Sequence, residues 1–212
     1  MLPSRQAPVS GDRRRRARQL RLLTIHEAVP GHYLQLAWSN RCDSLPRAVF
    51  GSGVFAEGWA VYVTQVMMDL GYGADDPALM LVHWKFYLRS TTNALMDIRI
   101  QSGSVDEDEA MRLMVEGGFQ EGGEATAKWD RARLSSTQLC EYFLGSVEMH
   151  GLEREARRRA EAEGTDFVYR PFLESVLAHG SPSLPVIRDI LFSSETAPRP
   201  AKGSKERPAP SR

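Results

Sequence analysis

Helical periodicity runs through nearly the whole interior of this chain, and strand-like alternation is hard to find. Asp12 is expected to cap the first helix, and Gly164 to end the fifth. The second helix should begin near Val54 and end before Gly71 or Gly73, and Pro185 should lie in the first turn of the last helix. The predicted helices cover residues 13–29, 54–70, 78–100, 106–116, 136–164, 166–180 and 181–192. The sequence therefore predicts an all-α fold.

The two ends of the chain differ in composition from the interior. Residues 1–11 and 193–212 are rich in Pro, Ser and Gly and poor in large apolar side chains, which is typical of disordered segments. The whole chain has 212 residues, of which 42% are hydrophobic, enough for one core. We therefore expect one helical domain over residues 12–192 between two disordered ends.

Charge and cysteine content limit the possible partners and compartments. Lys+Arg and Asp+Glu both total 27, so the formal net charge is zero and no global field favours nucleic acid or an anionic membrane. The arginine run at residues 13–16 is interpreted as a solvated helix end. The chain has only Cys42 and Cys140, and it shows neither a signal peptide nor an apolar run of about 20 residues. A cytoplasmic location is expected, with no nucleic-acid and no membrane partner.

Residues 24–35, TIHEAVPGHYLQ, contain two histidines six positions apart. In the metalloprotease motif H-E-x-x-H the histidines are four apart and share one face of a helix. On a straight helix His26 and His32 would diverge by about 120° and lie about 9 Å apart along the axis. Pro30 and Gly31 are the residues that most readily deform a helix. We hypothesise that a bulge at these two residues turns His32 back toward His26.

Glu57 lies in a predicted helix that is apolar nearly all round. A buried carboxylate is costly unless it pairs with a cation or a metal, so Glu57 either joins the histidines or pairs with an arginine. Two histidines and a glutamate are a common ligand set for one catalytic zinc ion, which makes His26, His32 and Glu57 candidate ligands. Glu27 would then be the general base that activates water for hydrolysis of an amide.

Two other interpretations stay open. The chain could be a non-catalytic helical interaction or assembly module, in which the histidines only cap and pack. It could also be a zinc hydrolase of a bond other than a peptide bond. Zinc content would test the first interpretation, and a panel of peptide and ester substrates would test the second.

The segments HEAVPGHYLQ and FAEGWAVYV resemble the paired signatures of the bacterial domain-of-unknown-function 885 family, whose logic is similar to that of gluzincin zinc metallopeptidases. The resemblance implies one zinc ion held by His26, His32 and Glu57, with Glu27 as catalytic acid and base and a peptide as substrate. It extends to WDRARLSSTQLCEYFLG and to FLESVLAHGSPSLPVIRDIL. Through the first of these segments it implies three further functional residues. Tyr142 would stabilise an oxyanion, Arg131 would stabilise the transition state or hold a substrate carboxylate, and Gln138 would contact substrate.

The sequence departs from the family pattern in three respects. Ser136 and Thr137 stand where Pro-Gly is commoner, and Thr64 stands where a second glutamate is frequent. The resemblance covers residues 20–192, which correspond only to the C-terminal part of a typical member. The expectation is therefore a zinc metallopeptidase-like domain whose cleft lacks one wall, with three alternatives: a fragment of a longer protein, a split product that needs a partner chain or N-terminal half, or a relic that binds zinc and is inactive alone.

Overall fold

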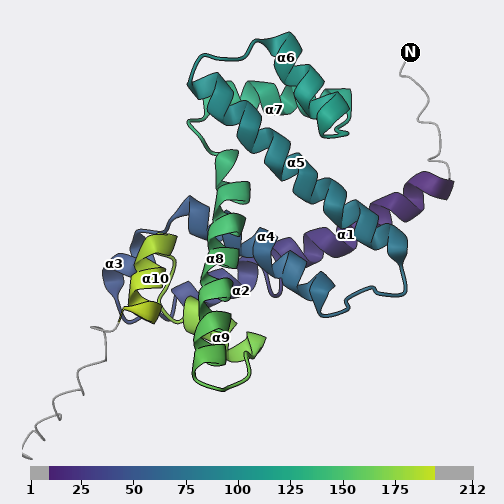
Figure 1. The fold of residues 1–212 in the computed structure, drawn as a ribbon. Helices are drawn as coiled ribbons and strands as arrows, with labels where there is room; N and C mark the ends of the chain where they lie inside the picture. The colour runs from purple at the N-terminus through teal and green to yellow at the C-terminus, as the bar shows by residue number, and fades with distance from the viewer. Residues whose placement is uncertain (1–9, 194–212) are drawn as a thin grey trace, which may run out of the picture.

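The computed structural model describes residues 10–193, and the ends predicted to be disordered lie almost entirely outside them. Within the described residues there are helices and no strand, which confirms the all-α prediction (Figure 1). The helices, one of them a π-helical turn η1, are α1 (Ser10–Glu27), α2 (His32–Ser39), α3 (Leu45–Val49), α4 (Gly53–Asp69), α5 (Pro77–Gln101), α6 (Glu107–Arg112), η1 (Leu113–Gly117), α7 (Gly122–Leu134), α8 (Cys140–Ala162), α9 (Tyr169–Leu177) and α10 (Leu184–Phe192).

Helices α4 and α8 form the centre of the fold and touch through their backbones. A Cβ atom added to Gly58 would lie 2.3 Å from the carbonyl carbon of Gly145, and one added to Gly145 would lie 2.1 Å from the carbonyl oxygen of Val54. These distances are far below van der Waals contact, so only glycine allows the two helices to approach this closely. The approach brings Glu57 on α4 and Tyr142 on α8 to the same region of the molecule.

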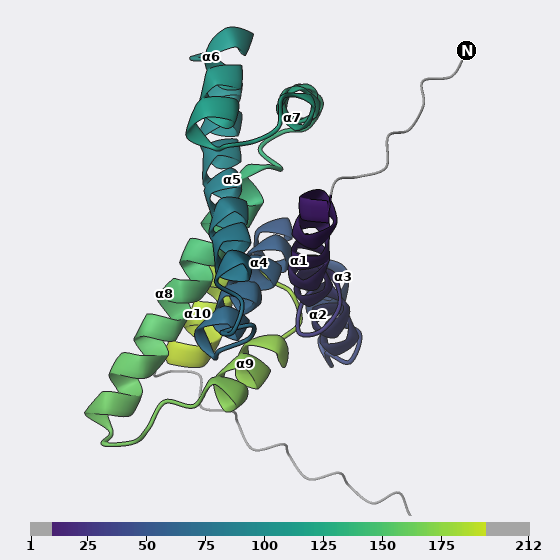
Figure 2. The ribbon, with the colours of Figure 1, turned by 90° about the vertical axis from the view of Figure 1, so that its right-hand side faces the viewer.

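Three apolar clusters hold the described helices together, and the smallest joins Leu22 of α1 to Met68 of α4 and Leu79 of α5. The largest is formed by α4, α8, α9 and α10, with Trp59 and Tyr62 as its largest fully buried side chains. The second joins the far end of α5 to α6, η1 and α7, where Met96, Met114 and Trp129 pack together. Figures 1 and 2 show α5 as the long helix that connects the two groups, with α6 and α7 at one end of it.

The boundaries differ from the prediction at several helices. Helix α1 begins at Ser10, so Asp12 lies inside its first turn. It does not occupy the predicted N-cap position, which precedes the first helical residue. The helix expected from residue 136 begins at Cys140, after bends and a turn. Helices α2, α3 and α7 were not predicted: α3 has five residues, and α7 begins with a glycine pair typical of a loop. The C-terminal ends predicted for two helices are confirmed. Helix α4 stops at Asp69, before Gly71, and Gly164 follows α8 with a φ of +69°.

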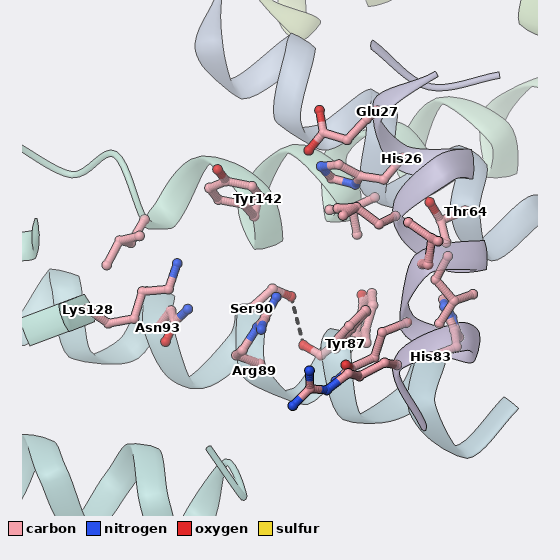
Figure 3. A pocket seen from close by; sticks show the side chains of 18 residues that line it. His26, Glu27, Thr64, His83, Tyr87, Arg89, Ser90, Asn93, Lys128 and Tyr142 are labelled. Atoms are coloured by element: carbon pink, nitrogen blue, oxygen red, sulfur yellow. Dashed lines mark hydrogen bonds between the residues drawn. The ribbon is translucent and has the colours of Figure 1, made fainter. Parts of the chain in front are cut away.

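A cavity of about 670 Å³ lies between α1 and α5 (Figure 3). One wall comes from the second half of α1, the other from α5, and α4 contributes Val61 and Thr64. Lys128 from α7 and Tyr142 from α8 also line it. The last turn of α1 carries His26 and Glu27 into the lining, so the cavity adjoins the histidine pair.

Candidate metal centre

The chain does not continue as one helix between the two histidines. Helix α1 ends at Glu27, four residues follow without helical structure, and α2 begins at His32. The predicted bulge within a single helix is therefore wrong in form, because the helix breaks completely at Pro30 and Gly31. The peptide bond before Pro30 is cis. The break has the predicted effect, since it frees His32 from the azimuth that a straight helix would impose.

Gly31 and Trp59 fix the connection between α1 and α2. A Cβ atom on Gly31 would lie 1.8 Å from the carbonyl oxygen of His26, so no other residue fits there without movement of the backbone. The indole Nε1 of Trp59 donates a hydrogen bond of 2.9 Å to the carbonyl oxygen of Pro30. Trp59 lies on α4, two residues after Glu57, so this bond holds the connection against the helix that carries the third candidate ligand.

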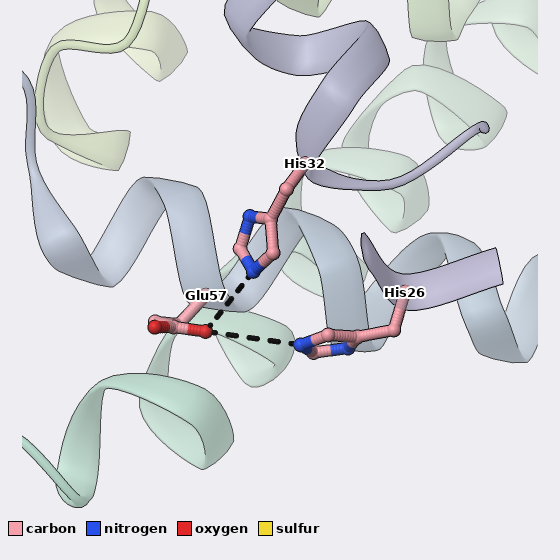
Figure 4. Close-up of side chains that lie close together, drawn as sticks. All are labelled: His26, His32 and Glu57. Carbon is pink, nitrogen blue, oxygen red and sulfur yellow. Dashed lines mark ion pairs between the residues drawn. The ribbon is translucent and has the colours of Figure 1, made fainter. Parts of the chain in front are cut away.

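His26, His32 and Glu57 converge on one point (Figure 4). Their ligand atoms all lie within 4.8 Å of one another, and no other such group of three occurs among residues 10–193. Oε2 of Glu57 is 3.3 Å from Nε2 of His32 and 3.9 Å from Nε2 of His26. Two atoms that each lie about 2.1 Å from one zinc ion can be at most about 4.2 Å apart, so both distances fit a shared ion.

The partners of Glu57 distinguish a metal site from a buried ion pair. Its Oε2 atom is buried and has no hydrogen-bond partner within the described part of the chain. Its ion pairs there are with the two histidines, and the alternative of an arginine partner is not seen. A carboxylate oxygen left without a hydrogen bond is costly, and a cation bound beside it would remove that cost. The donor set, two imidazoles and one carboxylate, fits zinc.

The three side chains influence one another's pKa values. Burial, and then the nearby His32, lower the pKa of His26. The Glu57 carboxylate raises the pKa of His32. Burial acts to raise the pKa of Glu57, but His32, Tyr142 and His26 together lower it below its usual range. Glu57 is therefore an anion at neutral pH, as a metal ligand must be.

Tyr142 lies next to this group. Its ring is nearly parallel to that of His26, with 6.4 Å between the centroids and 11° between the planes. Burial and the Glu57 charge raise the pKa of Tyr142, whereas Gln138 and Arg131 act to lower it. Glu27 and Tyr142 line the cavity beside His26, and Arg131 and Gln138 act on Tyr142, so the residues predicted from the paired signatures and the downstream segment fall in one region.

The cavity residues that sequence reasoning missed include Arg89 and Asn93 on α5, and Lys128 on α7. Figure 3 shows Lys128 and Asn93 at the same end of the cavity, beyond Tyr142 from His26. A usable signal existed in GGEATAKWDRARL, where Lys128 and Arg131 are three residues apart and so share one face if the segment is helical. Nothing in the sequence indicated that α5 faces α1 across the cavity.

Fold and site together define an all-α protein with a candidate metal centre built from two histidines and a glutamate. The chain matches the family described as "Bacterial protein of unknown function (DUF885)" over residues 7–191, and it belongs to that family. A comparison with curated proteins finds no match. None of the helices between residues 10 and 193 combines the length and the apolar character of a transmembrane span.

Two solved structures are similar to this chain. A candidate lipoprotein of unknown function from Shewanella oneidensis is 36% identical, with a TM-score of 0.76 over 88% of this chain and 34% of its own. A candidate lipoprotein from Colwellia psychrerythraea is 27% identical, with a TM-score of 0.73 over 78% of this chain and 28% of its own. The present chain thus spans about a third of the length of these relatives.

Proposed function

We propose that the protein is a zinc-dependent hydrolase of peptide bonds. The observation that carries the proposal is the convergence of His26 and His32 on a buried carboxylate oxygen of Glu57 that has no hydrogen-bond partner among the described residues. These three residues would hold the ion and leave a further position open, as in catalytic zinc sites. The chemistry that zinc supplies in such sites is activation of water and polarisation of a carbonyl group.

The residues of the chain itself would carry the proton and orient the substrate. Glu27 is exposed and lines the cavity beside His26, so its carboxylate can accept a proton from water and pass it to the departing amine. Hydrolysis adds water across the C–N bond and yields a carboxylate and an amine. The Tyr142 hydroxyl would donate a hydrogen bond to the oxyanion, a type of contact worth about 3 kcal/mol. Gln138 and Arg131 would orient that hydroxyl or the substrate.

Zinc stoichiometry tests the metal site directly. Elemental analysis of the purified chain should find about one zinc ion, and His32→Ala and Glu57→Gln should each remove it. A matched control is His179→Gln, because His179 contacts Arg47 and lies outside the candidate centre. Absence of zinc from the wild-type chain after loading would refute the metal site and favour an interaction module.

The reaction class needs a separate assay. Glu27→Gln should keep the zinc and lose hydrolysis of peptides, because the substitution removes the proton acceptor and no proposed ligand. Peptides and esters assayed side by side would distinguish peptide hydrolysis from hydrolysis of another bond. Cleavage that is unaffected by Glu27→Gln would exclude Glu27 as the base.

We also propose that the chain contacts a partner, either the remaining part of a longer family member or a separate chain. Large apolar side chains are exposed on α2, which begins at His32, and at the end of α3, among them Tyr33 and Leu36 on α2 and Phe50 directly after α3. Light scattering of the chain alone and mixed with the N-terminal part of a longer family member should detect association, and Tyr33→Lys with Phe50→Lys should abolish it. A monomer at every concentration that still hydrolyses peptides would exclude the need for a partner.

The cytoplasmic location stays a prediction. The two similar structures belong to candidate lipoproteins, and a lipoprotein is anchored by lipid. Cell fractionation with an antibody against the chain would decide between a cytoplasmic and a membrane-associated protein.

A further inference from the structure

We infer that Lys128 and Asn93 bind the free C-terminal carboxylate of a peptide whose last side chain enters the cavity between α1 and α5. This inference deepens the proposed function, on which it rests, by naming the substrate class: peptides cleaved near a free C-terminus. It concerns residues that neither the histidine motif nor the family resemblance indicated.

Lys128 is a half-buried ammonium group without a hydrogen bond or ion pair to any of residues 10–193. Glu124, four residues earlier on the same helix, is paired with Arg89 instead. Burial, and then the charges of Arg89 and Arg131, lower the pKa of Lys128, although Glu124 and Glu57 act to raise it. A half-buried ammonium group without an ion pair would be stabilised by an anion bound beside it. The cavity gives such an anion access to Lys128.

Asn93 supplies a second donor at the same place. Its Oδ1 accepts a hydrogen bond of 2.9 Å from Nε2 of Gln120, so its amide nitrogen remains available to donate. The residue is 6% exposed and lines the cavity, and Figure 3 shows its side chain beside that of Lys128. An ammonium and an amide N–H side by side match the two oxygens of a carboxylate.

Part of the cavity suits an apolar side chain. Leu20, Leu23 and Phe86 line it, and Leu20 and Leu23 are large apolar residues that remain exposed on α1. A cavity of about 670 Å³ lies within the range of small-ligand sites. The lining runs from Lys128 past Tyr142 to His26 and Glu27, so a carboxylate bound at Lys128 directs the preceding peptide bond toward the metal centre.

The test measures binding and does not depend on catalysis. The full chain, freed of metal with EDTA, is titrated calorimetrically with N-acetyl-alanyl-phenylalanine and with the C-terminal amide of the same dipeptide. Removal of metal prevents hydrolysis and also prevents the carboxylate from binding to zinc. The acid should bind about tenfold more tightly than the amide, as expected for a charge-assisted hydrogen bond.

Three variants connect this preference to Lys128. Lys128→Gln should bring the ratio of the two affinities close to one, and Lys128→Arg should keep most of it. Lys85→Gln is the matched control, because Lys85 lies on α5 outside the cavity lining and its loss should leave the ratio unchanged. Thermal unfolding of each variant verifies that the fold is intact. Equal binding of acid and amide by the wild-type chain, no binding of either, or an unchanged ratio in Lys128→Gln would overturn the inference.

These outcomes are independent of those that test the proposed function. If zinc binds and acid and amide peptides are hydrolysed equally well, the hydrolase proposal stands and the carboxylate site fails. A Lys128-dependent preference for the acid in a chain that binds no zinc would retain the carboxylate site and refute the hydrolase.

Discussion

The contact between Gly58 on α4 and Gly145 on α8 allows a sharp test of how the site is built. In Gly58→Ala the new Cβ atom would lie 2.3 Å from the carbonyl carbon and 2.4 Å from the Cα atom of Gly145. Both atoms belong to a helix backbone, so no side-chain rotation can relieve the overlap. Ordinary van der Waals contact would require the helices to separate by about 1 Å.

The expected loss in the free energy of unfolding follows from the core packing that this separation would weaken. Helices α4 and α8 contribute Trp59, Tyr62, Met149 and Leu152 to the main core, all at most 1% exposed. Overpacking costs about 1–3 kcal/mol, and a rigid backbone obstacle favours the upper end of that range. The higher helix propensity of alanine stabilises the variant by up to about 1 kcal/mol and offsets part of this cost. A net loss of about 2 kcal/mol should lower Tm by about 4–8 °C in a domain of this size.

Thermal unfolding followed by circular dichroism at the helical minimum measures this loss. Gly123→Ala is the matched control, because Gly123 lies in α7 with no atom within 4 Å of the added Cβ. The control should unfold at the wild-type temperature or above it, since it gains helix propensity without a clash. An unchanged or higher Tm for Gly58→Ala would refute the claim that the two backbones are in contact.

Three further predictions follow from named contacts. Gly31→Ala should abolish zinc binding in elemental analysis, because its Cβ would meet the His26 carbonyl oxygen at 1.8 Å, and retention of about one zinc ion would contradict this. Burial would raise the pKa of Glu153, but neighbouring donors lower it from 4.5 to about 2. Since the pKa of Glu153 is lower in the folded state, its carboxylate stabilises the folded protein. This contribution to the free energy of unfolding is complete above about pH 5 and is lost as the pH falls from about 4.5 toward 2. In urea titrations the Glu153→Gln variant should have a free energy of unfolding about 2–3 kcal/mol lower than the wild type at pH 7, and this free energy should depend less on pH. Parallel pH profiles of the variant and the wild type would contradict the lowered pKa of Glu153. Ser52→Ala should cost about 1 kcal/mol in the same titrations, because the Ser52 hydroxyl accepts a hydrogen bond from the Phe55 N–H at the start of α4, and an unchanged urea midpoint would exclude that cap.

The long helices could be predicted because their local signals agree. Helix α4 is apolar nearly all round and is followed by Gly71 with a φ of +92°, and α8 is followed by Gly164 in the same left-handed region. In helix α7 the local sequence signals do not all favour a helix. Only Ala125, Trp129 and Ala132 are buried in it, and its first residues are glycines. Its helical state depends on packing against α5 and α6, which local sequence does not encode.

The candidate ligands could be predicted for a different reason. His26 and His32 are close in sequence, and Glu57 is conspicuous as a carboxylate inside an apolar helix. The form of the break between the histidines could not be predicted, since proline and glycine are compatible with a bulge or with two helices. Lys128 and Asn93 come from helices far apart in sequence, and their meeting depends on how α5 and α7 are placed.

The six-residue spacing changes what determines the geometry of the histidine pair. In H-E-x-x-H the helix itself places both rings, so the ligand positions survive small changes in tertiary packing. Here the positions depend on the fit of Gly31 against the His26 carbonyl and on the hydrogen bond from Trp59 to Pro30. Trp59 belongs to α4, whose position is set by the glycine contact with α8. Metal affinity should therefore be coupled to the packing of α4 against α8, and a substitution such as Gly58→Ala should weaken zinc binding although it removes no ligand.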